Sequence, residues 1–275
     1  MRSVLLFIFS CFILCMKPCV SVAQCAAVNK AIQAGEELEY ELKFNWKFIW
    51  VNAGKAHMKM EAITYEGEPC FRSTLTAVSN KKVDFFFKMR DTLSCITTSR
   101  LEPKYFRKGA EEGSRYTVDE ASFSFKDDNC YVLQRRTYRD GTFKEKRDTS
   151  SVCVFDMLSI LIQARSFDPS TYVEGQKILF PMATGRKVEE QTLIFRGRKV
   201  FKAEDHTKYR CLVFSLVEYN KKGKEKEVIT FYVTDDANHL PVRLDLFLNF
   251  GSAKAFLKTM KGNRHPLTSI IKEED

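Results

Sequence analysis

The polar residues best suited to chemistry lie together in one short stretch, from Asp235 to Pro241. Two adjacent carboxylates beside a histidine could serve as general acid and base, or could bind a cation. The same residue types also form tight turns, because Asp and Asn side chains hydrogen-bond to nearby backbone and Pro241 fixes φ ahead of a strand. The pattern favours the turn, and Asp235, Asp236 and His239 are the polar residues whose role needs testing.

A cluster of aromatic residues supplies the second group of candidates. Aromatic faces suit both apolar ligands and carbohydrates, although the same side chains also fill hydrophobic cores. In a strand Trp46 lies on the same face as Phe48, and Trp50 continues that face if the strand runs on. The residues that could line a binding site are Trp46, Phe48, Trp50, Phe85, Phe86 and Phe87.

Other catalytic patterns are missing from the sequence. The four histidines are scattered, and none has a second His or Cys at the spacing of metal ligands. No Gly-x-Ser-x-Gly sequence marks a nucleophile elbow. We therefore expect no catalytic residues, no metal site and no cofactor, and the sequence favours a non-enzymatic role.

The first residues indicate where the protein works. Arg2 precedes an apolar run from Val4 to Met16, and Ser21-Val22-Ala23 matches a small-x-small cleavage site. A membrane-spanning helix needs about 20 apolar residues, so this run is too short for one. We predict a signal peptide over 1–23 and a mature protein in the periplasm or outer envelope, which excludes nucleic-acid partners and nucleotide chemistry.

Two alternatives to cleavage after Ala23 remain open. A lipoprotein signal also ends at a cysteine, but Gln24 before Cys25 is not the small residue that such a signal requires. The apolar run could instead remain attached as an uncleaved anchor.

The mature chain is basic. Removing Arg2 and Lys17 with the signal peptide lowers the formal net charge from +9 to +7. This charge is typical of a solvated surface, and it also allows attraction to an acidic partner. For an exported protein that partner would be anionic lipid, lipopolysaccharide or acidic glycan, and the basic, aromatic run from Tyr138 to Arg147 could contact it.

Six cysteines follow the predicted cleavage site at wide, irregular spacings. No Cys-x-x-Cys pair exists, so neither a zinc ribbon nor a thioredoxin-like motif is supported. An oxidising compartment permits disulfides, but several of these cysteines lie among strand residues and could equally be buried thiols. The sequence leaves the pairing open among Cys25, Cys70, Cys95, Cys130, Cys153 and Cys211.

The elements that must position these residues are mostly β-strands. From Leu38 to Phe48 apolar residues alternate with polar and charged ones, which predicts a strand with one buried face. Asp140-Gly141 predicts a hairpin turn. Further strands are predicted at 54–64, 70–78, 83–89, 92–98, 104–108, 114–118, 121–126, 130–138, 142–147, 177–181, 188–196, 199–203, 210–219, 227–234 and 242–250.

One helix stands out among these strands. Asp156 can cap it, the residues that follow are apolar nearly all round, and Asp168-Pro169 ends it. We predict a buried helix near 156–166 and a frayed chain from Gly262 onward. No linker rich in Pro, Gly or Ser divides the halves, so we predict a single β-rich domain over 24–275. Its fold class is mainly β, a large curved antiparallel sheet that forms a β-roll or open barrel around the helix.

Five short stretches carry a family resemblance through their order along the chain. They are Gly35 to Tyr40, Ala53 to Ala56, Thr98 to Pro103, Phe155 to Ser159 and Phe231 to Val242. Together they resemble a family of exported Gram-negative bacterial proteins, the domain of unknown function DUF3108. The resemblance implies a β-rich, roll- or barrel-like exported domain, and it brings no established activity and no catalytic residues.

Three functions remain open from the sequence. The first is a non-enzymatic periplasmic or envelope binding protein for an apolar or amphiphilic ligand such as a lipid or glycolipid, by analogy with curved-sheet lipid carriers. The second is a structural or interaction protein that contacts other envelope proteins without a pocket. The third is a hydrolase of envelope glycans with Asp235 or Asp236 as its acid or base.

Overall fold

Strands make up most of the molecule. The structure is a computed structural model that describes residues 25–46, 49–85, 88–248 and 251–272. The strands are β1 (Glu37–Trp46), β2 (Ile49–Tyr65), β3 (Glu68–Ser79), β4 (Met89–Thr98), β5 (Pro103–Glu112), β6 (Arg115–Lys126), β7 (Asn129–Tyr138), β8 (Phe143–Ser150), β9 (Lys177–Ala183), β10 (Val188–Lys202), β11 (Lys208–Tyr219), β12 (Glu225–Thr234), β13 (Pro241–Leu248), β14 (Gly251–Lys261) and β15 (Ile270–Ile271). The helices are α1 (Lys81–Asp84), α2 (Met157–Ala164) and the 3-10 helix η1 (Pro169–Thr171).

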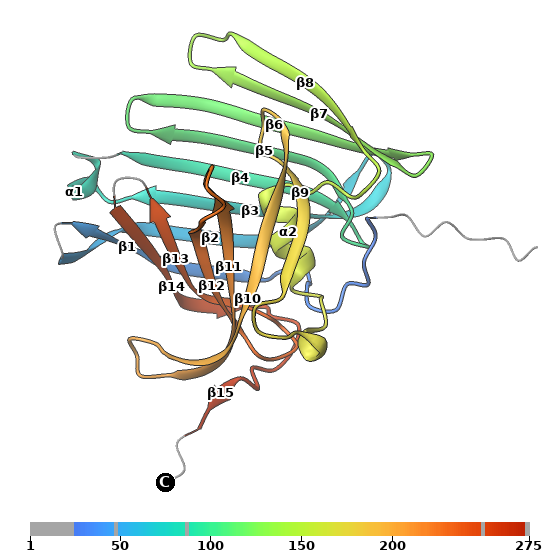
Figure 1. Cartoon of the computed structure of the whole chain (residues 1–275). Coiled ribbons are helices and arrows are strands. Elements are labelled where there is room, and N and C mark those ends of the chain that lie inside the picture. Colours follow the sequence, from blue (N-terminus) through green and yellow to red (C-terminus); the bar gives the residue numbers. More distant parts are fainter. Residues whose placement is uncertain (1–24, 47–48, 86–87, 249–250, 273–275) are drawn as a thin grey trace, which may run out of the picture.

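These strands form one antiparallel sheet that curves around α2 (Figure 1). Its order is β8-β7-β6-β5-β4-β3-β2-β1-β14-β13-β12-β11-β10-β9, with β15 paired to β11. Within the described chain the end strands β8 and β9 do not pair with each other, so the sheet is open. The prediction of a mainly β protein built on a large curved antiparallel sheet is confirmed.

Most neighbouring strands are also consecutive in the sequence, so short turns set their register. The predicted hairpin at Asp140-Gly141 is present between β7 and β8. The pairing of β1 with β14 is different, because it joins strands from opposite ends of the chain. That pairing makes the two halves of the protein one continuous sheet.

The alternation along β1 directs Leu38 and Tyr40 to the concave face, where α2 packs. On α2 the side chains of Leu158 and Ile162 are buried in the same core. Each such aliphatic side chain stabilises the fold by about 1.5–3 kcal/mol when it is fully buried. The helix is therefore held mainly by its apolar contacts with the sheet, as its apolar sequence predicts.

Asp156 caps α2, as the sequence predicts. One of its carboxylate oxygens, Oδ1, accepts hydrogen bonds from the N–H groups of Leu158 and Ser159 at 2.8 and 2.9 Å. The Ser159 hydroxyl in turn accepts from the Asp156 N–H at 3.0 Å, which completes a capping box. The predicted buried helix near 156–166 is confirmed.

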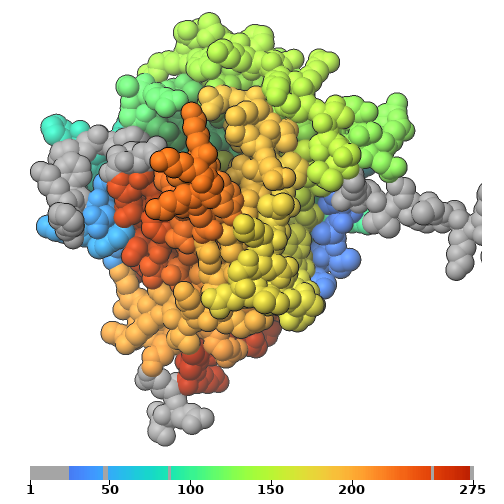
Figure 2. Space-filling view, viewed as in Figure 1, coloured from blue at the N-terminus to red at the C-terminus, as the bar shows by residue number. Residues whose placement is uncertain are grey.

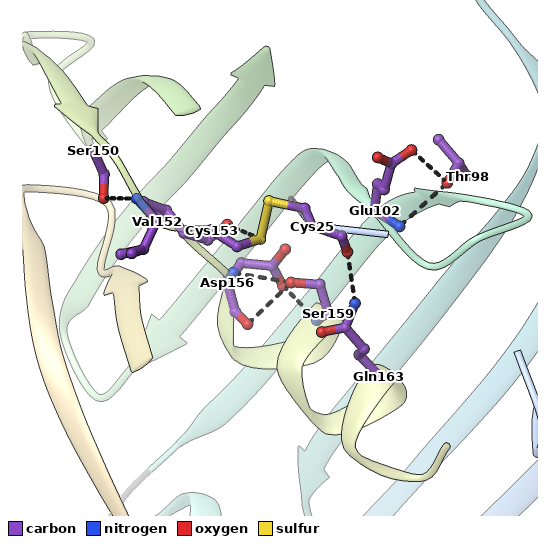
Figure 3. The surroundings of a disulfide bond; sticks show 10 residues. Cys25, Thr98, Glu102, Ser150, Val152, Cys153, Asp156, Ser159 and Gln163 are labelled. Atoms are coloured by element: carbon purple, nitrogen blue, oxygen red, sulfur yellow. Dashed lines mark hydrogen bonds between the residues drawn. A yellow bond between two sulfur atoms is a disulfide. The ribbon is translucent and has the colours of Figure 1, made fainter. Parts of the chain in front are cut away.

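A disulfide between Cys25 and Cys153 lies beside the start of α2 (Figure 3). It links the segment before β1 to the segment after β8, across a sequence separation of 128. Gln163 on α2 donates a hydrogen bond to the Cys25 carbonyl at 2.8 Å, so the helix is bound to the same segment. The remaining cysteines of the described chain are buried free thiols, namely Cys70, Cys95, Cys130 and Cys211.

Two pairs of strands that the sequence predicts as separate are single strands, since 114–118 and 121–126 lie in β6, and 188–196 and 199–203 lie in β10, apart from Ser114 and Ala203. Two further local predictions are wrong about the type of structure. A strand is predicted over 83–89, but Val83 and Asp84 belong to α1, and β4 begins only at Met89. Asn80 explains the difference, because its side-chain oxygen accepts from the Val83 N–H at 3.0 Å and caps a helix. The chain expected to fray from Gly262 onward forms β15, in which Ile270 pairs with Tyr209.

None of the helices in the described part of the chain is long and apolar enough to cross a membrane.

Replacing Cys153 with serine is expected to lower the free energy of unfolding by about 2–5 kcal/mol, because the cross-link no longer restricts the unfolded chain. Urea unfolding of parent and variant under non-reducing conditions measures the difference. Adding a reductant should bring the parent to the stability of the variant and leave the variant unchanged. Equal stability of the two proteins without reductant would contradict the prediction.

Candidate functional site

The concave face changes from apolar to charged beyond the strand positions that pack with α2. One row of paired residues across β4 to β7 lies in this core and consists of Cys95, Phe106, Ala121 and Gln134. Two residues further along each strand, on the same face, lies a second row of Leu93, Lys108, Asp119 and Arg136. The switch from one row to the next places ionisable groups at the edge of the hydrophobic core.

Asp91, Lys108 and Glu112 form a charged cluster on this face. Lys108 Nζ lies 3.8 Å from Asp91 Oδ2 and 3.3 Å from Glu112 Oε1. Asp91 is only 9% exposed, and its other oxygen, Oδ1, is buried without a hydrogen-bond partner in the protein. A buried carboxylate oxygen without a partner is costly, so this atom is suited to bind a donor that the protein does not supply.

Burial raises the pKa of Asp91 to about 6, while Lys108 opposes the rise and Glu112 adds to it. The carboxyl is therefore partly protonated just below neutral pH. In that state it can donate a hydrogen bond, and when ionised it accepts two or more. Beside the Lys108 ammonium, it gives the cluster both donors and acceptors for a polar group.

Asp119 and Arg136 continue the charged row and pair through two parallel hydrogen bonds. The turn between β9 and β10 reaches this pair from the other end of the sheet, because the Gly185 N–H donates to Gln134 Oε1 at 3.0 Å. A Cβ atom at Gly185 would lie 2.5 Å from Asp119 Cγ, and its φ is +83°, so a side chain does not fit there. The two halves of the open sheet therefore approach each other beside the cluster.

The charged cluster remains partly open to solvent. The side chain of Lys108 is 24% exposed and that of Glu112 is 39% exposed. Figure 2 shows the surface hollowed between the green strands of the first half and the orange strands of the second half. The concave face is thus accessible in a part that α2 does not cover.

The structure does not gather the aromatic candidates around a common cavity in its described part. After the β1–β2 turn Trp50 pairs with Asn45, and directly opposite residues share a face of the sheet. Trp50 therefore lies on the face opposite to that of Phe44. Trp50 was expected to continue the Trp46 face only if the strand ran on, and β1 instead ends at Trp46. The ring of Trp50 instead has Lys254 Nζ 4.4 Å from its centre.

The other aromatic candidates are only partly described. Phe85 follows α1 and is 86% exposed. Phe48, Phe86 and Phe87 lie outside the described residues, and the side chain of Trp46 does so as well. Their proposed role in ligand binding stays a prediction.

The polar stretch that begins at Asp235 forms the turn between β12 and β13, and its last residue, Pro241, begins β13. Asp236 Oδ1 accepts from the Asn238 N–H at 3.0 Å, and its Oδ2 accepts from the Ser269 N–H at 3.3 Å. Asp235 points to another partner, because its Oδ2 lies 3.3 Å from Arg198 Nε. The two carboxylates thus serve separate structural contacts, which supports the turn rather than an acid–base pair.

His239 in the same turn is bound to the end of α2. Its Nδ1 lies 2.7 Å from the carbonyl oxygen of Arg165, so this nitrogen carries the proton and donates. Arg165 Nε donates to the Asn238 carbonyl at 3.0 Å. The Arg165 guanidinium also forms a bidentate ion pair with Glu36, at 2.5 and 2.8 Å, and both side chains are 2% exposed. These contacts fix the turn to the helix and to the segment before β1.

Neither the Arg165–Glu36 ion pair nor the charged cluster was predicted from the sequence, for different reasons. Arg165 and Glu36 are 129 residues apart, and no local pattern connects them. For the charged cluster a signal existed, because alternation places Asp91 on the same face as Leu93 and Lys108 on the same face as Phe106. The predicted strands nevertheless leave Asp91 between 83–89 and 92–98 and Glu112 between 104–108 and 114–118, whereas Asp91 belongs to β4 and Glu112 to β5.

Among the described residues, no group of three or more His, Cys, Asp or Glu side chains is placed to hold a metal ion.

The open curved sheet with its internal helix defines a β-barrel-like protein. A similar solved structure is the β-barrel-like protein of the domain of unknown function DUF1849 from Brucella abortus, with a TM-score of 0.56. It is 7% identical in sequence, and the match covers 86% of this chain and 98% of that chain. A likeness at this identity shows the fold alone.

The chain belongs to the family described as protein of unknown function DUF3108, whose sequence model matches residues 39–258. The predicted family resemblance is therefore confirmed. A second solved structure, a Bacteroides fragilis protein with a YmcC-like fold, is 10% identical and has a TM-score of 0.34, over 86% of this chain and 100% of that chain. A search of curated proteins found no match.

Replacing Asp91 with asparagine is expected to stabilise the fold at neutral pH by about 1–2 kcal/mol, because a neutral amide avoids the cost of burying a charge. The folded pKa of Asp91 lies above its ordinary value. In the parent, the stability that protonation of Asp91 gives is therefore complete below about pH 4 and is lost as the pH rises through about 6. In urea unfolding across this pH range, the free energy of unfolding of the variant should exceed that of the parent by an amount that grows with pH. A difference that stays constant would contradict the raised pKa of Asp91.

Replacing Arg165 with methionine is expected to lower the free energy of unfolding by about 3–5 kcal/mol, because Glu36 is left buried without its partner. Adding Glu36→Gln in the same chain should recover part of the loss. The exposed pair Lys59–Glu61 offers a matched control, with side chains 40% and 42% exposed. Lys59→Met should cost less than about 1 kcal/mol in the same urea unfolding experiment.

Proposed function

We propose that the protein is an exported, non-enzymatic binding protein that holds a lipid or another amphiphilic ligand on the concave face of its sheet. The observation that carries the proposal is the boundary between the apolar core and the charged cluster of Asp91, Lys108 and Glu112. An amphiphile has the same two-part character, with an apolar chain and a polar head joined at one point. On the concave face its chain would follow apolar side chains and its head would reach the cluster.

The contacts of the cluster suggest which head group would fit. Lys108 supplies a positive charge that is shared between two carboxyls and is still partly exposed. A ligand oxygen that carries negative charge would bind this ammonium by a charge-assisted hydrogen bond. Asp91 Oδ1 would accept from a hydroxyl or amine of the same head. The proposed ligand is therefore a lipid or glycolipid whose head has both an anionic oxygen and a donor.

Export is supported by the sequence and by the disulfide. The signal-peptide features lie in 1–23, ahead of the described residues. Disulfides persist in oxidising compartments, and Cys25–Cys153 is one. Because the Cys25 sulfur is used in that bond, it is not free to carry a lipid, which argues against the lipoprotein alternative. We place the mature protein in the periplasm or the outer envelope.

The hydrolase alternative has little support from the site. A glycosidase needs two carboxyls that face each other across the substrate. Asp236 is engaged with backbone N–H groups, and Asp235 is engaged with Arg198. An interaction protein that contacts other envelope proteins without binding a ligand remains the competing proposal.

Native mass spectrometry with lipid extraction, on protein exported to a periplasm, tests the proposal. We expect a bound lipid or glycolipid in a stoichiometric amount. Lys108→Gln should lower its occupancy by about tenfold, because one charge-assisted hydrogen bond contributes about 1.5–3 kcal/mol. Arg107→Gln is the matched control, since it removes a charge from the next residue of β5, which faces the other side of the sheet.

Two outcomes would reject the proposal. The first is protein that shows no adduct after export or after incubation with envelope lipids and glycans, which would favour the interaction protein. The second is equal loss of ligand in Lys108→Gln and Arg107→Gln, which would place the ligand away from the concave face.

A further inference from the structure

Exposed apolar side chains gather at one end of the sheet, at the start of β2, the end of β13 and the residue after α1. β2 begins with Ile49 and Trp50, which are 67% and 39% exposed. Phe85 follows α1, and β13 ends with Phe247 and Leu248, which are 40% and 38% exposed. We call these five residues the rim patch. Solvent-exposed apolar groups concentrated in this way mark a surface that contacts another apolar phase or partner.

Contacts between these strand ends show that the rim patch is one surface. Leu248 at the end of β13 pairs with Gly251 at the start of β14. β14 in turn lies against β1, because a Cβ atom at Gly251 would be 2.9 Å from the Phe44 ring. Asn80, which caps α1, donates to the Asn52 carbonyl of β2 at 2.6 Å. Figure 1 shows α1 beside the end of β1 and the start of β2. The described side chains at these strand ends and after α1 therefore lie at the same end of the sheet.

Basic side chains accompany these apolar ones. Lys81 and Lys82 on α1 are exposed, and with Val51, Asn52 and Asn80 they line an open hollow of about 560 Å³. Lys254 lies over the Trp50 ring. The nearby acidic groups have basic partners of their own. Asp84 pairs with Arg90, and Asp245 pairs with Arg243. Glu41, which accepts a hydrogen bond from the Asn52 side chain, lies near Lys43 and Lys258.

We propose that the rim patch docks on the surface of an anionic phospholipid bilayer. Aromatic and aliphatic side chains beside lysines are the combination that binds a membrane interface, because the apolar groups enter the headgroup boundary while the lysines meet anionic lipid. A protein partner would need a complementary acidic and apolar surface of its own, whereas an anionic bilayer supplies both features. The net positive charge of the whole chain also favours attraction to an anionic bilayer.

The proposed docking also gives the concave face a position relative to the membrane. β4 begins next to α1 at Met89, passes Asp91, and continues to Cys95 in the core with α2. The charged cluster therefore lies between the rim patch and the helix, on the side of the sheet nearest the docked surface. The docking itself does not depend on a ligand being bound there.

Vesicle sedimentation of the purified protein tests the docking. We expect binding to vesicles of phosphatidylcholine that contain phosphatidylglycerol, weaker binding at high salt, and little binding to pure phosphatidylcholine. Lys81→Glu with Lys82→Glu should lower the partition coefficient by at least about tenfold. The matched control is Lys221→Glu with Lys222→Glu, which makes the same charge change on the exposed β11–β12 turn.

A second measurement follows the apolar contact. The chain has two tryptophans, so Trp46→Phe leaves Trp50 as the sole indole. Its fluorescence should shift to the blue when vesicles containing phosphatidylglycerol are added, and Phe85→Ser should weaken vesicle binding by about tenfold. Phe143→Ser, which removes a ring that is 57% exposed on β8, should not change it.

Three results would overturn the proposal. They are an absence of binding to the anionic vesicles, an equal loss of binding in the two lysine pairs, and an unchanged Trp50 spectrum when the protein sediments with vesicles.

Discussion

The packing of α2 against the concave face is the contact on which the rest of this structure depends. A sheet of this length exposes an apolar face that must be covered, and α2 covers it with Leu158 and Ile162. Both ends of the helix are fixed to distant parts of the chain. Near its start the Cys25–Cys153 disulfide and the Asp156 cap hold it, and after its end Arg165 binds Glu36 and the turn that contains Asn238. The disulfide, the buried ion pair and the polar turn are thus parts of one arrangement that keeps the helix inside the sheet.

Because α2 is short, it covers only part of the concave face. Charged residues lie on the part of the face next to the one that α2 covers. Residues of the row that packs with the helix are mostly apolar, whereas the next row contains Lys108, Asp119 and Arg136. Charges so close to a hydrophobic core need partners, and Asp119 and Arg136 satisfy each other. Asp91 is satisfied less completely, since burial raises its pKa and one oxygen has no partner in the protein. Asp91 thus combines an unsatisfied buried oxygen with a position beside partly exposed charged groups, and this combination supports the proposed ligand site.

The open edges of the sheet are protected by different means. The edge strand β8 is rich in lysine, arginine and acidic residues, which discourages pairing with another chain. The other edge strand, β9, contains Pro181, which cannot donate a ladder hydrogen bond, and Phe155 from the segment after β8 pairs beside it. The Gly185 contact with Gln134 then brings the β9–β10 turn to β7. These features disfavour edge-to-edge pairing with another strand, although the two ends of the sheet do not pair with each other.

The sequence by itself determined the strand-rich class, the capped helix and the turn at Asp235 to Pro241, because alternation, capping and turn formation act over a few neighbouring residues. It did not determine α1, where Asn80 caps a helix in a stretch that aromatic content favoured as a strand. It also could not show that Trp50 lies on the face opposite to Phe44, since the position of a turn decides that. Only the tertiary structure decided the Cys25–Cys153 pairing, the Arg165–Glu36 ion pair and the cluster around Asp91. Each of these depends on strand order and register, which bring residues far apart in the chain onto one face of the sheet, and no local pattern carries that information.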